Sequence, residues 1–129
     1  MPGPAVAPAA EPAQTPPWRV VIHVDEAGPD RQRLALGNVA NLLHERGPEA
    51  VTVEVVTNGP GIGAVVSSSP VAVEVGRLLA QGVTVLACAN SLRSQGVLPG
   101  DLLAGVAVVP SGISHLVRRQ VEGWAYVRP

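Results

Sequence analysis

The sequence predicts an α/β fold, a three-layer α/β/α sandwich with a mostly parallel five-stranded sheet. Three observations predict it. Short β-branched runs alternate along the chain with segments of helical periodicity. The connections between these segments are short, as in the strand–helix units that build parallel sheets. The 129 residues are 47% hydrophobic, which suits one domain with a core of its own.

The folded domain is predicted to span residues 18–129. Residues 1–17 contain six prolines among small residues, a composition that cannot build a packed element. We therefore expect a disordered or extended Pro/Ala-rich tail before Trp18.

Five strands are predicted, at residues 19–24, 51–57, 83–89, 105–109 and 124–128. The first is β-branched and nearly continuous in its apolar residues, and the second alternates. The third, "VTVLACA", is apolar on both faces and is therefore expected inside the sheet. The order of the strands cannot be read from the pattern.

Helices are predicted between the strands. Apolar residues recur at helical spacing within residues 29–48, at Leu36, Val39, Ala40 and Leu43. Asp30 is expected to cap this helix. The second is expected to start with Ser69 as cap and Pro70 at its first position. A short helical piece follows Cys88. A last helix should be capped by Ser111, with Ile113, Leu116 and Val117 on one side.

Charge and cysteine content exclude several classes of function. The chain has nine Arg, no Lys and a net charge of −1, so it lacks the basic patch of a nucleic-acid binder and the lysine of Schiff-base chemistry. One cysteine allows no internal disulfide and no Cys-rich zinc site, and we expect no metal or cofactor. No apolar run is long enough to span a membrane, and the N-terminus does not resemble a signal peptide. The chain is expected to be cytoplasmic.

The single cysteine, Cys88, falls where an active site is expected. In open α/β sheets, ligands bind outside the carboxyl ends of the strands. Polar or small residues end four of the predicted strands: His23 and Asp25, Asn58 and Gly59, Cys88 and Asn90, and Ser111 and Gly112. If the segment after Cys88 is helical, with Asn90 or a neighbour as cap, exposed backbone N–H groups would stabilise its thiolate, the form that attacks sulfur.

Other interpretations of these residues stay open. A free cysteine often only packs in a core. His23 at a strand end and His44 in a last helical turn are compatible with structural roles, and His115 is expected on a solvated helix face beside Arg118 and Arg119. Asn58-Gly59 is a common turn pair. The stretch "GPGIG" resembles a phosphate-binding loop only weakly, because it has neither a full GxGxxG nor a P-loop lysine.

Several stretches together resemble the DsrE/DsrF-like sulfur-relay family. They are "GNVANLL", "NGPGI", "ACANSL", "VPSGI" and "RRQVEGWAYVRP", in order over residues 19–129. The chain looks closest to the short, single-domain members. The resemblance implies a three-layer α/β domain that assembles as trimers or hexamers. It also implies that Cys88 matches the cysteine that receives a persulfide sulfur, with Asn58, Gly59 and Asn90 near it.

The first hypothesis is therefore a sulfur carrier, resembling a sulfurtransferase, that accepts a persulfide sulfur on Cys88 from a donor protein and passes it to an acceptor thiol. Two alternatives remain. The crevice could bind a small nucleotide or anion through Asn58, Gly59 and helix N-termini. The chain could also be an oligomeric scaffold with its "WAY" end buried between copies. In both alternatives, Cys88 is a packing residue.

Overall fold

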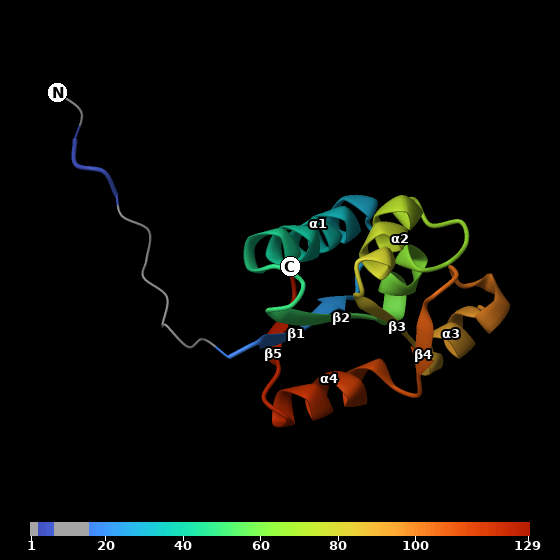
Figure 1. Cartoon of the computed structure of the whole chain (residues 1–129). Coiled ribbons are helices and arrows are strands. Elements are labelled where there is room, and N and C mark those ends of the chain that lie inside the picture. The colour runs from blue at the N-terminus through green and yellow to red at the C-terminus, as the bar shows by residue number, and fades with distance from the viewer. Residues whose placement is uncertain (1–2, 7–15) are drawn as a thin grey trace.

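One five-stranded sheet forms the centre of the molecule in the computed structural model, which describes residues 3–6 and 16–129 (Figure 1). The strands are β1 (Trp18–Val24), β2 (Val51–Thr57), β3 (Thr84–Cys88), β4 (Ala107–Val109) and β5 (Ala125–Val127). Their order is β4-β3-β2-β1-β5, and every neighbouring pair is parallel. Most of the predicted tail, residues 1–17, lies outside the described residues.

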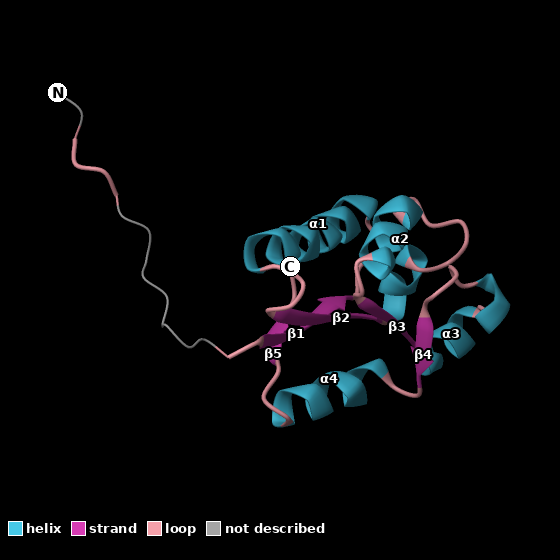
Figure 2. Ribbon diagram, in the orientation of Figure 1, coloured by secondary structure: helices cyan, strands magenta, loops and turns pink. Residues whose placement is uncertain are grey.

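Helices cover both faces of the sheet, which confirms the predicted three-layer α/β fold. They are α1 (Pro29–Arg46), α2 (Ala72–Ala80), α3 (Ala89–Gln95) and α4 (Gly112–Val121), with short 3-10 helices η1 (Gly59–Ala64) and η2 (Pro99–Asp101). Figure 2 shows α1 and α2 on one face, α4 on the other, and α3 beside the edge strand β4. As expected, β3 is an interior strand, between β2 and β4.

Alternation along the strands divides the core into two parts. On the α1 and α2 side, the buried residues include Val20, Ile22, Val53, Val55 and Val85. The opposite side has a smaller apolar cluster beneath α4, made by Val21, Val56, Leu86 and Leu116. Toward the carboxyl ends of the strands, this second side continues into polar residues, and the candidate site lies there.

Two helix starts differ from the prediction. The first helix begins at Pro29 after Gly28, and Asp30 lies in its first turn, because proline fits the first helical position best. The second begins at Ala72: the Ser69 hydroxyl accepts a hydrogen bond from the Val71 N–H at 3.0 Å and closes a turn that holds Pro70 before the helix. The predicted cap at Ser111 is confirmed, since its Oγ accepts from the Ser114 N–H at 3.2 Å.

The prediction that His115 lies on a solvated face is wrong. His115 is buried, and its Nε2 lies 2.7 Å from Glu54 Oε1 of β2. The helix turns His115 and Arg119 toward this buried carboxylate, so Leu116 is the one large apolar residue of α4 in the core. Ile113 and Val117, expected on the same side as Leu116, are each 54% exposed.

None of the helices in the described residues combines the length and the apolar character needed to cross a bilayer.

Candidate functional site

Cys88 is the last residue of β3 and also the residue that precedes the first turn of α3. The predicted helix after the cysteine exists, with Cys88 itself rather than Asn90 at the cap position. The strand alternation turns its side chain toward α4, and the residue is 5% exposed. The thiol therefore lies at the carboxyl edge of the sheet, where ligands bind in open α/β folds.

Hydrogen bonds to the sulfur outweigh the effect of burial on its ionisation. Burial raises the pKa of the Cys88 thiol, because a charged sulfur is poorly solvated inside a protein. Hydrogen bonds from the Gly112 backbone, from the Ser91 hydroxyl and backbone, and from the Asn90 backbone lower it, and the net pKa lies below the usual value. At a given pH, Cys88 is therefore more often a thiolate, the nucleophilic form, than an ordinary buried cysteine is.

Gly112, the first residue of α4, lets that helix approach the thiol closely. A Cβ on Gly112 would lie 3.2 Å from Cys88 Cβ and 3.3 Å from Asn58 Cβ, tighter than an ordinary contact. The absence of a side chain thus brings the Gly112 amide to the sulfur. It also places Cys88 and Asn58 side by side beneath the same helix end.

The glycine turn after β2 is fastened to α3 rather than open to a ligand. The Gly59 N–H donates to Ser91 Oγ at 2.8 Å, and the Gly59 carbonyl accepts from Gln95 Nε2 at 2.7 Å. The Gly61 N–H donates to the Asn58 carbonyl at 3.0 Å. Ser91 Oγ accepts the hydrogen bond from Gly59, so the hydroxyl hydrogen of Ser91 is available to donate to Cys88. Both loop amides are used within the chain, so they do not form a phosphate cradle.

His23 joins the site through Asn58 and not through the sulfur. Its Nε2 lies 2.7 Å from Asn58 Oδ1, and its Nδ1 lies 2.7 Å from the Tyr126 hydroxyl. His23 is 7% exposed, and both ring nitrogens are occupied. It therefore shapes the surroundings of Cys88.

Asn90 contributes its backbone alone. Its backbone N–H helps to lower the pKa of the thiol, whereas its side-chain Oδ1 accepts a hydrogen bond from Arg93 at the surface.

The structure brings all the predicted site residues to one edge of the sheet and adds three that sequence reasoning did not assign. Ser91 and Gly112 hold the thiolate, and Tyr126 holds His23. Gly112 follows a predicted strand end, so its place at the carboxyl edge of the sheet could be predicted, whereas its contact with the sulfur could not. The role of Tyr126 could be predicted only if the strand order were known, because β5 pairs with β1 at the far side of the sheet from Cys88.

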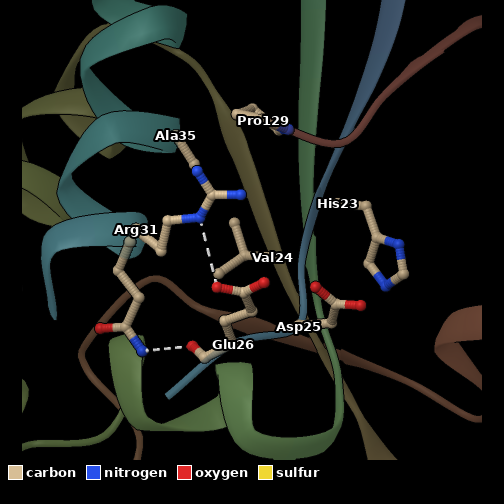
Figure 3. A pocket seen from close by; sticks show the side chains of 8 residues that line it. His23, Val24, Asp25, Glu26, Arg31, Ala35 and Pro129 are labelled. Atoms are coloured by element: carbon tan, nitrogen blue, oxygen red, sulfur yellow. Dashed lines mark hydrogen bonds and ion pairs between the residues drawn. The ribbon is translucent and has the colours of Figure 1, made fainter. Parts of the chain in front are cut away.

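The small cavity on the other side of β1 is filled by ion pairs. Figure 3 shows Arg31 and Ala35 across the strand from His23, with Glu26 between. Glu26 pairs with Arg31 at 3.3 Å, and the remaining space is about 10 Å³, at the lower limit of what one water needs. In residues 3–6 and 16–129, no three His, Cys, Asp or Glu side chains are grouped to hold a metal ion.

No protein-family model and no curated protein matches the chain. Solved structures do. The ychN protein from E. coli is 17% identical with a TM-score of 0.69, covering 87% of this chain and 99% of its own. BT1422 from Bacteroides thetaiotaomicron is 18% identical with a TM-score of 0.65, covering 86% and 94%. At these identities the likeness shows the fold alone.

A third solved structure is much more similar in sequence. The protein of unknown function MTH1491 from Methanobacterium thermoautotrophicum is 46% identical, with a TM-score of 0.83. The match covers 87% of this chain and 99% of that one. Identity at this level over nearly the whole of a protein reflects common descent. This chain belongs to the same protein family as MTH1491.

Proposed function

We propose that this protein is a sulfur carrier of the DsrE/DsrF-like sulfur-relay type, which accepts a persulfide sulfur on Cys88 and passes it to a partner thiol. One observation carries the proposal: the lone thiol lies at the carboxyl edge of the sheet, where donors from Gly112, Ser91 and Asn90 lower its pKa. Perturbed ionisation is typical of functional groups. The resemblance of the sequence to that family supports the same chemistry.

The transfer is balanced without a cofactor. The Cys88 thiolate attacks the outer sulfur of a donor persulfide, R–S–SH, and a new sulfur–sulfur bond forms at Cys88. The donor's own sulfur–sulfur bond breaks, and its electron pair leaves on the donor thiolate, R–S⁻. An acceptor thiolate then attacks the outer sulfur of the Cys88 persulfide and takes it over. The sulfur–sulfur bond at Cys88 breaks, and Cys88 is released as a thiolate. Cys88 is oxidised in the first exchange and reduced in the second, so the protein ends unchanged.

The site favours this chemistry over binding of a nucleotide or anion. An anion site at the glycine turn needs free backbone N–H groups. Here the Gly59 N–H is bound to Ser91, and the Gly61 N–H is bound to the Asn58 carbonyl. The Gly112, Ser91 and Asn90 donors near the carboxyl edge point instead to the sulfur of Cys88.

We expect incubation with a small persulfide to add one sulfur atom to the wild-type protein and none to Cys88→Ser, measured by intact-protein mass spectrometry. A reductant should remove the added sulfur. Ser91→Ala should still gain sulfur but more slowly at neutral pH, because the hydroxyl that helps to lower the thiol pKa is lost. Uptake by Cys88→Ser, or no uptake by the wild type while an exposed control thiol reacts, would contradict the proposal.

We also propose that the carrier works in the cytoplasm as a homo-oligomer, a trimer or hexamer, as the resemblance implies. A reducing compartment keeps the lone thiol and its partner thiols free. The outer side of α4 supports assembly, because Ile113, Val117 and Val121 follow one another at four-residue spacing and are 54%, 54% and 83% exposed. An apolar stripe of this kind is typical of a surface that is covered in an assembly.

Val117→Glu is expected to lower the sedimentation coefficient of the native protein by breaking the assembly, since a charge would be buried in the contact. Val73→Glu is the matched control, because Val73 is 62% exposed on α2, on the opposite side of the sheet. A wild-type protein that sediments as a monomer, or equal effects of the two substitutions, would speak against this contact.

A further inference from the structure

A chain of three hydrogen-bonded side chains leads from the edge strand β5 to the neighbour of the thiol. The Tyr126 hydroxyl lies 2.7 Å from His23 Nδ1, and His23 Nε2 lies 2.7 Å from Asn58 Oδ1. Tyr126 belongs to β5, His23 to β1, and Asn58 follows β2, so the chain crosses three adjacent strands. We call Tyr126, His23 and Asn58 the Asn58 relay.

The hydrogen bonds of the relay run in one direction. A carbonyl oxygen can only accept, so His23 Nε2 carries the hydrogen and donates to Asn58 Oδ1. A neutral imidazole with its hydrogen on Nε2 has a lone pair on Nδ1, which accepts from the Tyr126 hydroxyl. The amide oxygen thus sets the tautomer of His23, the hydroxyl stabilises that tautomer by donating to Nδ1, and His23 in turn holds the Asn58 amide in this orientation.

This orientation leaves the other end of the amide, Asn58 Nδ2, as a donor. In the part of the chain that the structure describes, no protein group accepts a hydrogen bond from that nitrogen. Thr57 pairs with Ala87 in the parallel ladder, so Asn58 and Cys88 are level on neighbouring strands. His23 occupies the amide oxygen from the β1 side, whereas Cys88 lies on the β3 side. The side chain that carries this unused donor therefore lies beside the reactive thiol.

We propose that Tyr126 and His23 are positioning residues that hold the Asn58 amide N–H toward the outer sulfur of a persulfide on Cys88. This inference rests on the proposed function. The outer sulfur carries negative charge when the persulfide is ionised, and a fixed N–H donor stabilises that charge more than mobile water does. The relay moves no proton and no electron. The sulfur–sulfur bond of the donor breaks and that of Cys88 forms as described above, and the relay fixes where the transferred sulfur rests.

The relay and the donors to the thiol have separable tasks. Gly112, Ser91 and Asn90 stabilise the resting thiolate. The Asn58 N–H is needed only once a second sulfur is present. Loss of the relay should therefore slow sulfur transfer without shifting the pH at which the thiol becomes reactive, whereas general damage to the site would change both.

Tyr126→Phe, Asn58→Ala and the double variant test this. The first measurement is the initial rate of sulfur uptake from glutathione persulfide. The second is the pH profile of Cys88 alkylation by iodoacetamide. We expect Tyr126→Phe to slow uptake about fivefold, the worth of one hydrogen bond. We expect Asn58→Ala to slow it on the order of a hundredfold, the lower end of the loss seen when one oxyanion-hole donor is removed. The double variant should match Asn58→Ala, because Tyr126 acts only through Asn58. The alkylation profile should stay that of the wild type.

Two features keep the test specific. Phenylalanine retains the ring that packs 5.7 Å from His23, so Tyr126→Phe removes only the hydroxyl. Val127→Ala, the next residue of β5 on its opposite face, is the matched control and should leave uptake unchanged. Three results would overturn the relay but leave the proposed function standing: additive losses in the double variant, a wild-type rate for Tyr126→Phe, or a shifted alkylation profile. No uptake by the wild-type protein would overturn the proposed function and the relay with it.

Discussion

Replacing Gly61 with alanine is expected to destabilise the protein by about 4 kcal/mol, beyond the usual cost of overpacking a core. A Cβ on Gly61 would lie 2.1 Å from the Val24 carbonyl oxygen, with two more backbone atoms of Val24 and Asp25 closer than 3.0 Å. Both partners are main chain, so no side-chain rotation can relieve the clash. Either η1 or the end of β1 must move, and urea denaturation followed by circular dichroism measures the loss.

Gly63→Ala is the matched control, since Gly63 lies in the same 3-10 helix two residues later. A Cβ there would have its nearest contact at 3.8 Å, with Gln32 Nε2, which is an ordinary distance. We expect its stability to stay within about 0.5 kcal/mol of the wild type. Equal stability of the two variants would show that η1 does not lie against β1 as described.

The Gly61 contact also bears on the site. Where η1 lies against the end of β1, the Asn58 N–H donates to the Val24 carbonyl at 3.2 Å, and Asn58 is brought within reach of His23. A Gly61→Ala protein that still folds should therefore lose the geometry of the Asn58 relay before it loses the sheet.

The fold was predictable because local and global signals agree in this chain. The strand "VTVEVVT" is observed over the predicted residues, 51–57, and Ser111 caps the last helix as expected. The order of the strands was not predictable, since β5 returns past three strands to pair with β1. That pairing depends on long-range packing, which no local pattern records.

The site was predictable in outline for the same reason. Parallel strands end at one edge, so strand ends alone placed Cys88, Asn58 and His23 together. What sequence reasoning missed depends on distances across the fold, such as Gly112 against the sulfur. The burial of His115 also went unpredicted, because a histidine beside Arg118 and Arg119 on a helix looks solvated until a buried carboxylate on another element is known.

That carboxylate, Glu54, is the subject of the second prediction: Glu54→Gln should cost about 2–3 kcal/mol at neutral pH. Arg119 donates to both Glu54 oxygens at 2.9 Å, and His115 Nε2 lies 2.7 Å away. Removing one partner of a buried pair costs roughly 3–5 kcal/mol, because the other charge is left without a counter-ion. The cost is smaller here because Arg119 keeps 26% exposure and a 2.9 Å contact with Glu122.

Glu122→Gln is the control for this prediction. Glu122 also pairs with Arg119, but its side chain is 43% exposed, so water replaces the lost contact and the cost should stay below about 1 kcal/mol. Similar losses for Glu54→Gln and Glu122→Gln would mean that burial of Glu54 contributes nothing.

The difference between wild type and Glu54→Gln should also depend on pH. Burial raises the pKa of Glu54, but the hydrogen bonds and charges of Arg119 and His115 outweigh it and leave the pKa below its usual value. The ionised carboxylate therefore stabilises the folded state. Its contribution is fully present above the unfolded pKa of about 4.3 and is lost as the pH falls through the lower folded value. Denaturation at neutral pH and at acid pH should show the two proteins converging in stability at acid pH, where the wild-type carboxyl is protonated as well.

The same variant connects the buried pair to the thiol. Glu54 fastens α4 to β2 through His115 and Arg119, and Gly112 at the start of that helix donates to Cys88. If the pair sets the position of the helix, Glu54→Gln should raise the pH at which Cys88 is alkylated. This effect would be indirect, because Glu54 is not one of the groups that lower the pKa of Cys88. If alkylation is unchanged while stability falls, Ser111 and Leu116 are enough to hold the helix start, and Glu54 contributes to folding alone.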